Sequence, residues 1–115
     1  MLVIRAEQLH ALNAARRAQF RRGVLARARA EMPALAAVPE ETLAACIAAA
    51  IEAAGRHDIF GDAAVARFAL ISAALAFSPP DPETARAAAE ALDDDALSTL
   101  ERLERAETLV RPAMR

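Results

Sequence analysis

The chain has 115 residues and a formal net charge of −2, a length that suits one domain, residues 1–115, and leaves little room for a second. Hydrophobic residues make up 56% of it but aromatic residues only 3%, so the core must be built from Leu, Ile, Val and Ala. This composition favours a tightly packed helical bundle and argues against a β-sandwich, which needs β-branched and aromatic side chains. All 14 basic residues are arginine, which a GC-rich genome explains more simply than a functional demand for guanidinium groups.

The first predicted helix runs from about Ala6 to about Glu31. Pro33 stops it, because proline cannot continue the hydrogen-bond ladder of a helix. Five apolar residues recur along it at helical spacing and predict a stripe that faces the core. They are Leu9, Leu12, Phe20, Val24 and Ala28.

The second helix is predicted to start after Pro39 and to end near Gly55. Its apolar face is spaced as one side of a helix requires, and consists of Leu43, Cys46, Ile47, Ala50, Ile51 and Ala54. The third helix begins near Asp62 and ends near Phe77, and it is apolar almost all round. Such a helix is normally central and buried, so we expect residues 62–77 to form the middle of the bundle, with Arg67 at the solvent edge.

Two shorter helices complete the prediction. Asp81 is a good N-cap, and Pro82 then stands at the first helical position, where its missing N–H costs nothing. The fourth helix ends near Leu92, with Ala85, Ala88, Ala89 and Leu92 expected to face inward. The fifth is expected from about Asp94 to Val110, with Leu97, Leu100, Leu103 and Val110 inward, a surface pair between Glu101 and Arg105, and a frayed tail from Arg111.

Catalytic constellations are missing from the sequence. Cys46 lies on an apolar helical face, where a buried thiol is expected rather than a nucleophile. His57 and Asp58 stand side by side before the third helix, and we interpret them as a turn with a capping aspartate rather than an acid–base pair. Asp93–Asp95 is interpreted as a solvated charge run, because three adjacent side chains diverge and cannot share one metal ion. We therefore expect no enzyme activity, no cofactor and no metal.

The sequence also predicts a cytoplasmic protein. No stretch is apolar over the roughly 18 residues that a membrane span needs. Charged residues follow Met1–Ile4 at once, so a signal-peptide core is not expected. The single cysteine excludes an internal disulfide framework and fits a reducing compartment.

Charge is distributed unevenly along the chain. Residues 1–31 hold seven arginines and two glutamates, whereas residues 32–115 hold seven arginines and fourteen aspartates or glutamates. The basic first helix is therefore a plausible docking surface for an acidic partner, with Arg16, Arg17, Arg21 and Arg22 as the candidate contacts. Nucleic acid is less favoured, because the chain is slightly acidic overall and no aromatic platform accompanies the arginines.

A motif pattern covers about two thirds of the chain. It opens with Ile4-Arg5-Ala6-Glu7-Gln8, and its middle part consists of Ala54, His57, Asp58, Ile59, Asp62, Val65, Arg67 and Phe68. With these residues the chain resembles small helical proteins encoded near bacterial type VI secretion spike and effector genes. It departs from them at His57-Asp58, where they usually have Tyr-Gly, and after the third helix, where they have a tryptophan. The resemblance implies a helical accessory protein of a secretion or contractile apparatus, without catalytic residues.

The sequence thus predicts an all-α, compact bundle of four to five helices. The function we expect is that of a small, non-enzymatic protein-binding accessory protein, such as an adaptor, chaperone or immunity-type partner, of a bacterial secretion or toxin system. A DNA-binding regulator that uses the arginine-rich first helix is one alternative. A homo-oligomeric structural subunit, for instance a homodimer, is the other.

Overall fold

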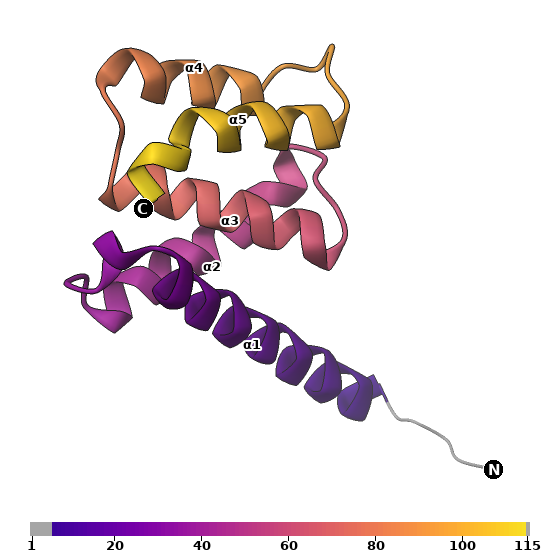
Figure 1. Cartoon of the computed structure of the whole chain (residues 1–115). Coiled ribbons are helices and arrows are strands. Elements are labelled where there is room, and N and C mark those ends of the chain that lie inside the picture. The colour runs from indigo at the N-terminus through magenta and orange to yellow at the C-terminus, as the bar shows by residue number, and fades with distance from the viewer. Residues whose placement is uncertain (1–5, 115) are drawn as a thin grey trace.

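The computed structural model describes residues 6–114, which form five α-helices and one short 3-10 helix. In chain order the elements are α1 Ala6–Glu31, η1 Pro33–Leu35, α2 Glu40–Arg56, α3 Asp62–Phe77, α4 Pro82–Leu92 and α5 Thr99–Met114. No strand occurs in this part of the chain. The all-α bundle expected from the sequence is therefore confirmed (Figure 1).

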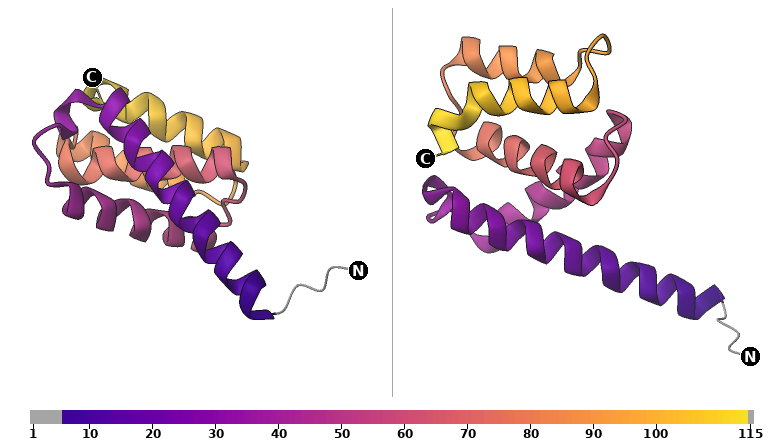
Figure 2. Two further views of the ribbon diagram at one scale, coloured as in Figure 1. Left: turned by 90° about the horizontal axis from the view of Figure 1, so that it is seen from below. Right: turned by 45° about the vertical axis from the view of Figure 1, so that its right-hand side comes forward.

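Helix α3 is the central element of the bundle. It packs against α2 on one side and α5 on the other, while α1 crosses both α2 and α3 (Figures 1 and 2). Seven of its residues are buried: Ala66, Phe68, Ala69, Leu70, Ile71, Ala73 and Ala74. Four of the seven are alanines, which let the neighbouring helices approach closely. The prediction of a buried helix over residues 62–77 is thus confirmed.

The fourth helix is capped as the sequence predicts. The Asp81 side chain accepts hydrogen bonds from the backbone N–H of Thr84 at 3.1 Å and from its hydroxyl at 2.7 Å. Pro82 occupies the first helical position. The Thr84 hydroxyl and N–H also lower the pKa of the Asp81 carboxyl, so it stays ionised as a helix N-cap prefers. Of the expected inward residues, Ala88 and Leu92 are buried but Ala89 is exposed.

The expected start of the last helix was wrong. Asp94 does not begin it, because its carboxylate accepts the backbone N–H of Ala96 at 3.0 Å and holds a bend there. Helix α5 begins at Thr99 behind a reciprocal cap. In this cap the Ser98 hydroxyl accepts the N–H of Glu101 at 3.2 Å, and the Glu101 carboxylate accepts the N–H of Ser98 at 3.3 Å. The expected pair of Glu101 with Arg105 is not among the salt bridges of residues 6–114.

The inward face of α5 differs from the predicted one in the same region. Leu103 and Val110 are buried as expected, but Leu100 is 55% exposed and Arg102 is buried instead. The helix also continues to Met114 rather than fraying at Arg111. Its end is tied down by the Ser78 hydroxyl, which donates to the carbonyl of Ala113 at 2.8 Å.

Helix α1 packs on the bundle with only its second half. Val24 and Ala28 are buried and Phe20 is half-buried, whereas Leu9 and Leu12 are 52% and 50% exposed. The predicted core-facing stripe is therefore wrong for its first two residues. The reason is length, since α1 has 26 residues and the helices beneath it, α2 and α3, have 17 and 16. The N-terminal part of α1 extends beyond them (Figure 2).

Arg67 joins two helices instead of marking a solvent edge. Its Nε and Nη2 atoms donate to the two carboxylate oxygens of Glu107 on α5, at 2.6 and 2.9 Å. Both side chains are about three-quarters buried, with 26% and 23% exposed. A forked pair of this kind has fixed geometry and is stronger than a single contact.

We predict that the Arg67–Glu107 pair contributes a measurable coupling energy. Removing both partners in a double-mutant cycle, with Arg67→Ala and Glu107→Ala, should give about 1–2 kcal/mol of interaction free energy in urea unfolding. Arg67→Lys should lose most of it, because an ammonium group cannot form the fork. A coupling energy near zero would show that α3 and α5 do not depend on this pair.

No helix in the described part of the chain is both long enough and apolar enough to cross a membrane.

Candidate functional site

The described arginines differ in what their side chains contact. Four are engaged within the molecule: Arg27 pairs with Glu31, Arg29 donates to the carbonyls of Leu35 and Val38, Arg67 pairs with Glu107, and Arg102 donates to backbone carbonyls. The candidate contacts Arg16, Arg17, Arg21 and Arg22 are exposed and take part in no salt bridge of residues 6–114. Helix α1 thus presents a concentrated, unneutralised positive charge to solvent.

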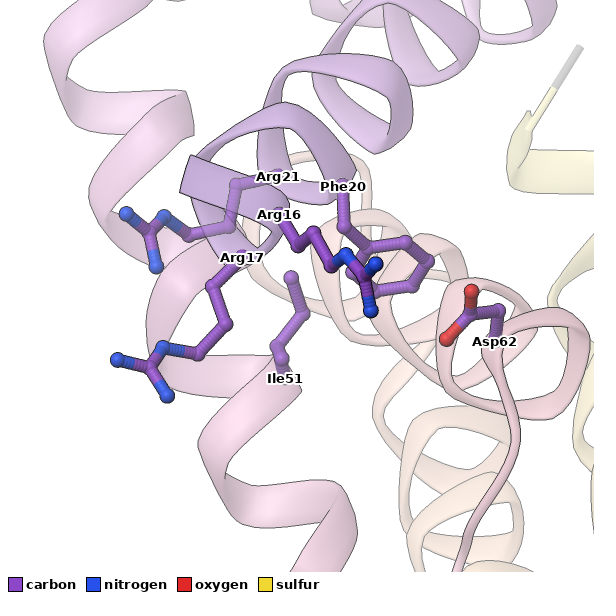
Figure 3. Close-up of a pocket in the computed structure, with 6 residues that line it drawn as sticks. All are labelled: Arg16, Arg17, Phe20, Arg21, Ile51 and Asp62. Carbon is purple, nitrogen blue, oxygen red and sulfur yellow. The ribbon is translucent and has the colours of Figure 1, made fainter. Parts of the chain in front are cut away.

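Three of the four candidates line one shallow hollow of about 360 Å³ (Figure 3). Arg16, Arg17 and Arg21 come from α1, and the other lining residues are Phe20, Ile51 and Asp62. Ile51 and Phe20 are half-buried and form the apolar part of the hollow, between α1 and α2. Figure 3 shows Arg16 on the side of Asp62, while Arg17 and Arg21 point away from it on the other side of Ile51. The hollow therefore has a basic side and a side with a carboxylate.

This arrangement is chemically suited to binding carboxylates. Guanidinium groups are permanently charged and bind carboxylates through two parallel hydrogen bonds. An apolar floor beside them adds burial of a hydrophobic side chain, which supplies affinity that surface charges alone do not. Asp62 would repel a carboxylate placed next to it. The hollow thus fits an acidic segment that also carries an apolar residue.

The fourth candidate lies along the same helix in a second hollow. Arg22 and Arg21 line it together with Ala18, Leu25 and Ala44, so it too lies between α1 and α2. Arg21 takes part in both hollows. The four arginines predicted from the sequence therefore form one continuous surface, which we call the arginine surface.

Two residues that line the first hollow, Ile51 and Asp62, could not be assigned to it from sequence patterns. Ile51 was expected in the core face of α2, and Asp62 stood out only as a helix start. Both come close to the arginines because α1 crosses α2 and passes the N-terminus of α3. Such a crossing depends on three-dimensional packing, so no periodic pattern of residues in the sequence predicts it.

His57 and Asp58 do not form an acid–base pair. His57 ends helix α2, and its Nδ1 lies 2.9 Å from the carboxylate of Asp93, while its ring lies 5.3 Å from that of Phe68. Asp58 has φ 56°, the left-handed conformation that follows many helix ends. Its N–H donates to Gly55 and the N–H of Ile59 donates to Ala54, at 3.2 and 2.9 Å, so both residues belong to a Schellman helix end.

We predict that Asp58→Gly stabilises the protein, because glycine adopts the left-handed conformation without a Cβ penalty. The expected gain is about 0.5–1 kcal/mol in the free energy of unfolding. Gly61 has φ 92° and provides the opposite control, since Gly61→Ala should destabilise by about 1 kcal/mol although its Cβ would meet no neighbour. Thermal unfolding of both variants tests this, and a loss of stability in Asp58→Gly would contradict it.

The remaining chemistry-bearing residues serve packing and turns. Cys46 is half-buried, and burial raises the pKa of its thiol, so the reactive thiolate is scarce at neutral pH. Asp93 faces His57 and Asp94 binds the N–H of Ala96, so these neighbouring carboxylates point to different partners. No group of three or more potential metal ligands occurs within residues 6–114.

The residues that carry the resemblance can be placed only in part. Ile4 and Arg5 lie outside the described residues. Ala54, Ile59 and Phe68 are buried in the core, where helix packing explains them. Comparisons with protein-family models, with curated proteins and with solved structures find no match.

Proposed function

We propose that this chain is a small, non-enzymatic accessory protein that binds another protein through the arginine surface of α1. Adaptor, chaperone and immunity-type partner are the roles that such a surface serves. The single observation that supports the proposal most is the hollow in which Arg16, Arg17 and Arg21 surround Phe20 and Ile51 without a neutralising salt bridge. A role in a bacterial secretion or toxin system is proposed from the family resemblance alone.

The expected partner is acidic and partly apolar. Unpaired guanidinium groups favour carboxylates, and the charge attracts an acidic surface from a distance and speeds association. The apolar floor then contributes to the lifetime of the complex, because dissociation requires its re-exposure to water. Arginine is also one of the residue types enriched at protein interfaces.

Affinity capture from a native bacterial lysate tests this proposal. Three baits are compared. The first is the wild type, and the second is a four-site variant with Arg16, Arg17, Arg21 and Arg22 changed to Glu. The third is a control with Arg86 on α4 and Arg105 on α5, both exposed, changed to Glu. We expect one defined acidic protein to be retained by the wild type and the control and to fall at least about tenfold with the four-site variant. Equal capture by all three baits would refute docking through the arginine surface.

The same proteins distinguish the proposal from DNA binding. A DNA-binding helix would bind duplex DNA at low salt, and the affinity would fall steeply as salt is added, because phosphate contacts release counterions. We expect no such binding, since the acidic residues of α2 to α5 repel a polyanion. Salt-sensitive binding of duplex DNA by the wild type, lost in the four-site variant, would favour the regulator instead.

A further inference from the structure

Four large apolar side chains within residues 6–114 remain exposed, two of them on α1 and two on the α2–α3 connection and α5. They are Leu9, Leu12, Phe60 and Leu100, which are 52%, 50%, 71% and 55% exposed. Phe60 belongs to the α2–α3 connection and Leu100 to the first turn of α5. These two segments adjoin, because Arg102 Nη1 donates to the carbonyl of His57 at 2.8 Å and His57 Nδ1 lies 2.9 Å from Asp93.

The N-terminal part of α1 projects beyond the rest of the bundle (Figure 2). The hollow brings Arg16 and Phe20 next to Asp62, the first residue of α3. Residues 6–15, which we call the arm, therefore continue past the α2–α3 connection (Figures 1 and 2). Every residue of the arm is exposed. A surface that covers the arm would stabilise it, because most helical stability in proteins comes from packing of an apolar face.

The end of the bundle carries the charge opposite to that of α1. Residues 57–62 and 93–101, which we call the acidic end, contain six carboxylates and no arginine. These are Asp58, Asp62, Asp93, Asp94, Asp95 and Glu101. The arm, by contrast, leads directly into the exposed pair Arg16 and Arg17. One molecule thus carries both halves of a complementary contact: leucines followed by arginines, and apolar residues in segments rich in carboxylates.

We infer that the partner of the arm and its adjoining arginines is the acidic end of a second copy of this chain. This inference rests on the proposed function, since it names the acidic surface that α1 binds. Leu9 and Leu12 would pack on Phe60 and Leu100 of the other copy, and Arg16 and Arg17 would face its carboxylates.

The arm extends beyond the other helices (Figure 2), so its leucines can reach a second molecule. If each copy places its arm on the acidic end of the other, the two contacts are related by a two-fold axis and the assembly closes as a dimer.

Sedimentation velocity over roughly a hundredfold range of protein concentration tests the pairing. The wild type and the Arg86→Glu, Arg105→Glu control should shift to twice the mass of the chain. Leu9→Ser with Leu12→Ser should weaken dimerisation roughly tenfold or more, because it removes the apolar contact and changes only exposed positions. Circular dichroism of each variant checks that α2 to α5 remain folded.

A charge swap makes the test specific to this interface. Arg16→Glu with Arg17→Glu gives the arm and the acidic end charges of the same sign, so this variant should be monomeric alone. Replacing Asp93, Asp94, Asp95 and Glu101 by Arg leaves two carboxylates against four arginines, so the end becomes positive like α1, and this variant should also be monomeric alone. An equimolar mixture of the two variants should form a heterodimer, because both contacts between them become attractive. A dimer unaffected by either variant, or a mixture that stays monomeric, overturns the inference.

The outcomes also separate this inference from the proposed function. The wild type could stay monomeric over the whole concentration range and still capture a different acidic protein through its arginines. That result overturns the second-copy inference and supports the proposed function. A wild type that neither dimerises nor captures any protein through the arginines contradicts both.

Discussion

Replacing Arg102 is expected to destabilise the protein more than replacing any other charged residue that the structure describes. Its side chain is only 7% exposed, and its Nη1 atom donates to the carbonyls of His57 and Leu92 at 2.8 and 3.2 Å. His57 ends α2 and Leu92 ends α4, so one buried cation satisfies the carbonyl ends of two helices. Its Nη2 atom also donates to the Thr99 hydroxyl at 3.3 Å.

Arg102→Met should therefore cost about 2–4 kcal/mol of unfolding free energy, because the methionine keeps much of the volume but leaves two buried carbonyls without a donor. Urea unfolding measures this directly. Arg105→Ala is the matched control on the exposed face of the same helix and should change stability by less than about 0.5 kcal/mol. If Arg102→Met were as stable as the wild type, the carbonyls would have found water, and the guanidinium would not hold the helix ends together.

Truncating Ile71 is expected to produce a second large effect. Ile71 lies in the middle of α3, is fully buried at 0% exposed, and belongs to the one core cluster shared by the five α-helices. Ile71→Ala removes packing and leaves a cavity where a helix of mostly small residues has little to rearrange, so the expected loss is about 3–4 kcal/mol. Small domains have a total stability of only about 5–15 kcal/mol, so this variant should be marginally folded at elevated temperature.

The control for Ile71 is the same truncation at Ile51. Ile51 is half-buried beside the arginine surface, so Ile51→Ala should cost roughly half as much or less. Thermal and urea unfolding of the two variants compare them. Equal losses at the two positions would mean that α3 is not the centre of the core. Ile51→Ala should also weaken partner capture, because it removes part of the apolar floor.

The helices could be predicted from the sequence because their signals are local. Alanine-rich stretches interrupted by prolines define the segments, and the Asp81–Pro82 pair fixes the start of α4. The continuous apolar surface of residues 62–77 identified the central helix. The start of α5 was wrong because Asp94 and Ser98 are both good cap residues, and only the reciprocal bonds between Ser98 and Glu101 decide between them.

The site could be predicted only in part, because periodicity does not say where a helix loses its neighbours. The stripe of α1 continues from Phe20 back to Leu9, yet the bundle ends before it. The burial of Arg102 could not be predicted either, since it depends on the carbonyl of His57, which is 45 residues away in the sequence, and on that of Leu92 in the preceding helix. The four arginines were identifiable from composition alone, but Ile51 and Asp62 joined them only through helix crossing.

Hydrogen exchange with and without the captured partner tests most directly whether α1 is the docking surface. The backbone amides of the arm and of the first turns that follow, residues 6–22, should exchange rapidly in the free protein, because no other helix covers most of that segment. We expect partner binding to slow exchange across residues 6–22 and to leave the middle of α4 unchanged. Protection confined to α4, with residues 6–22 exchanging equally fast in both states, would contradict it.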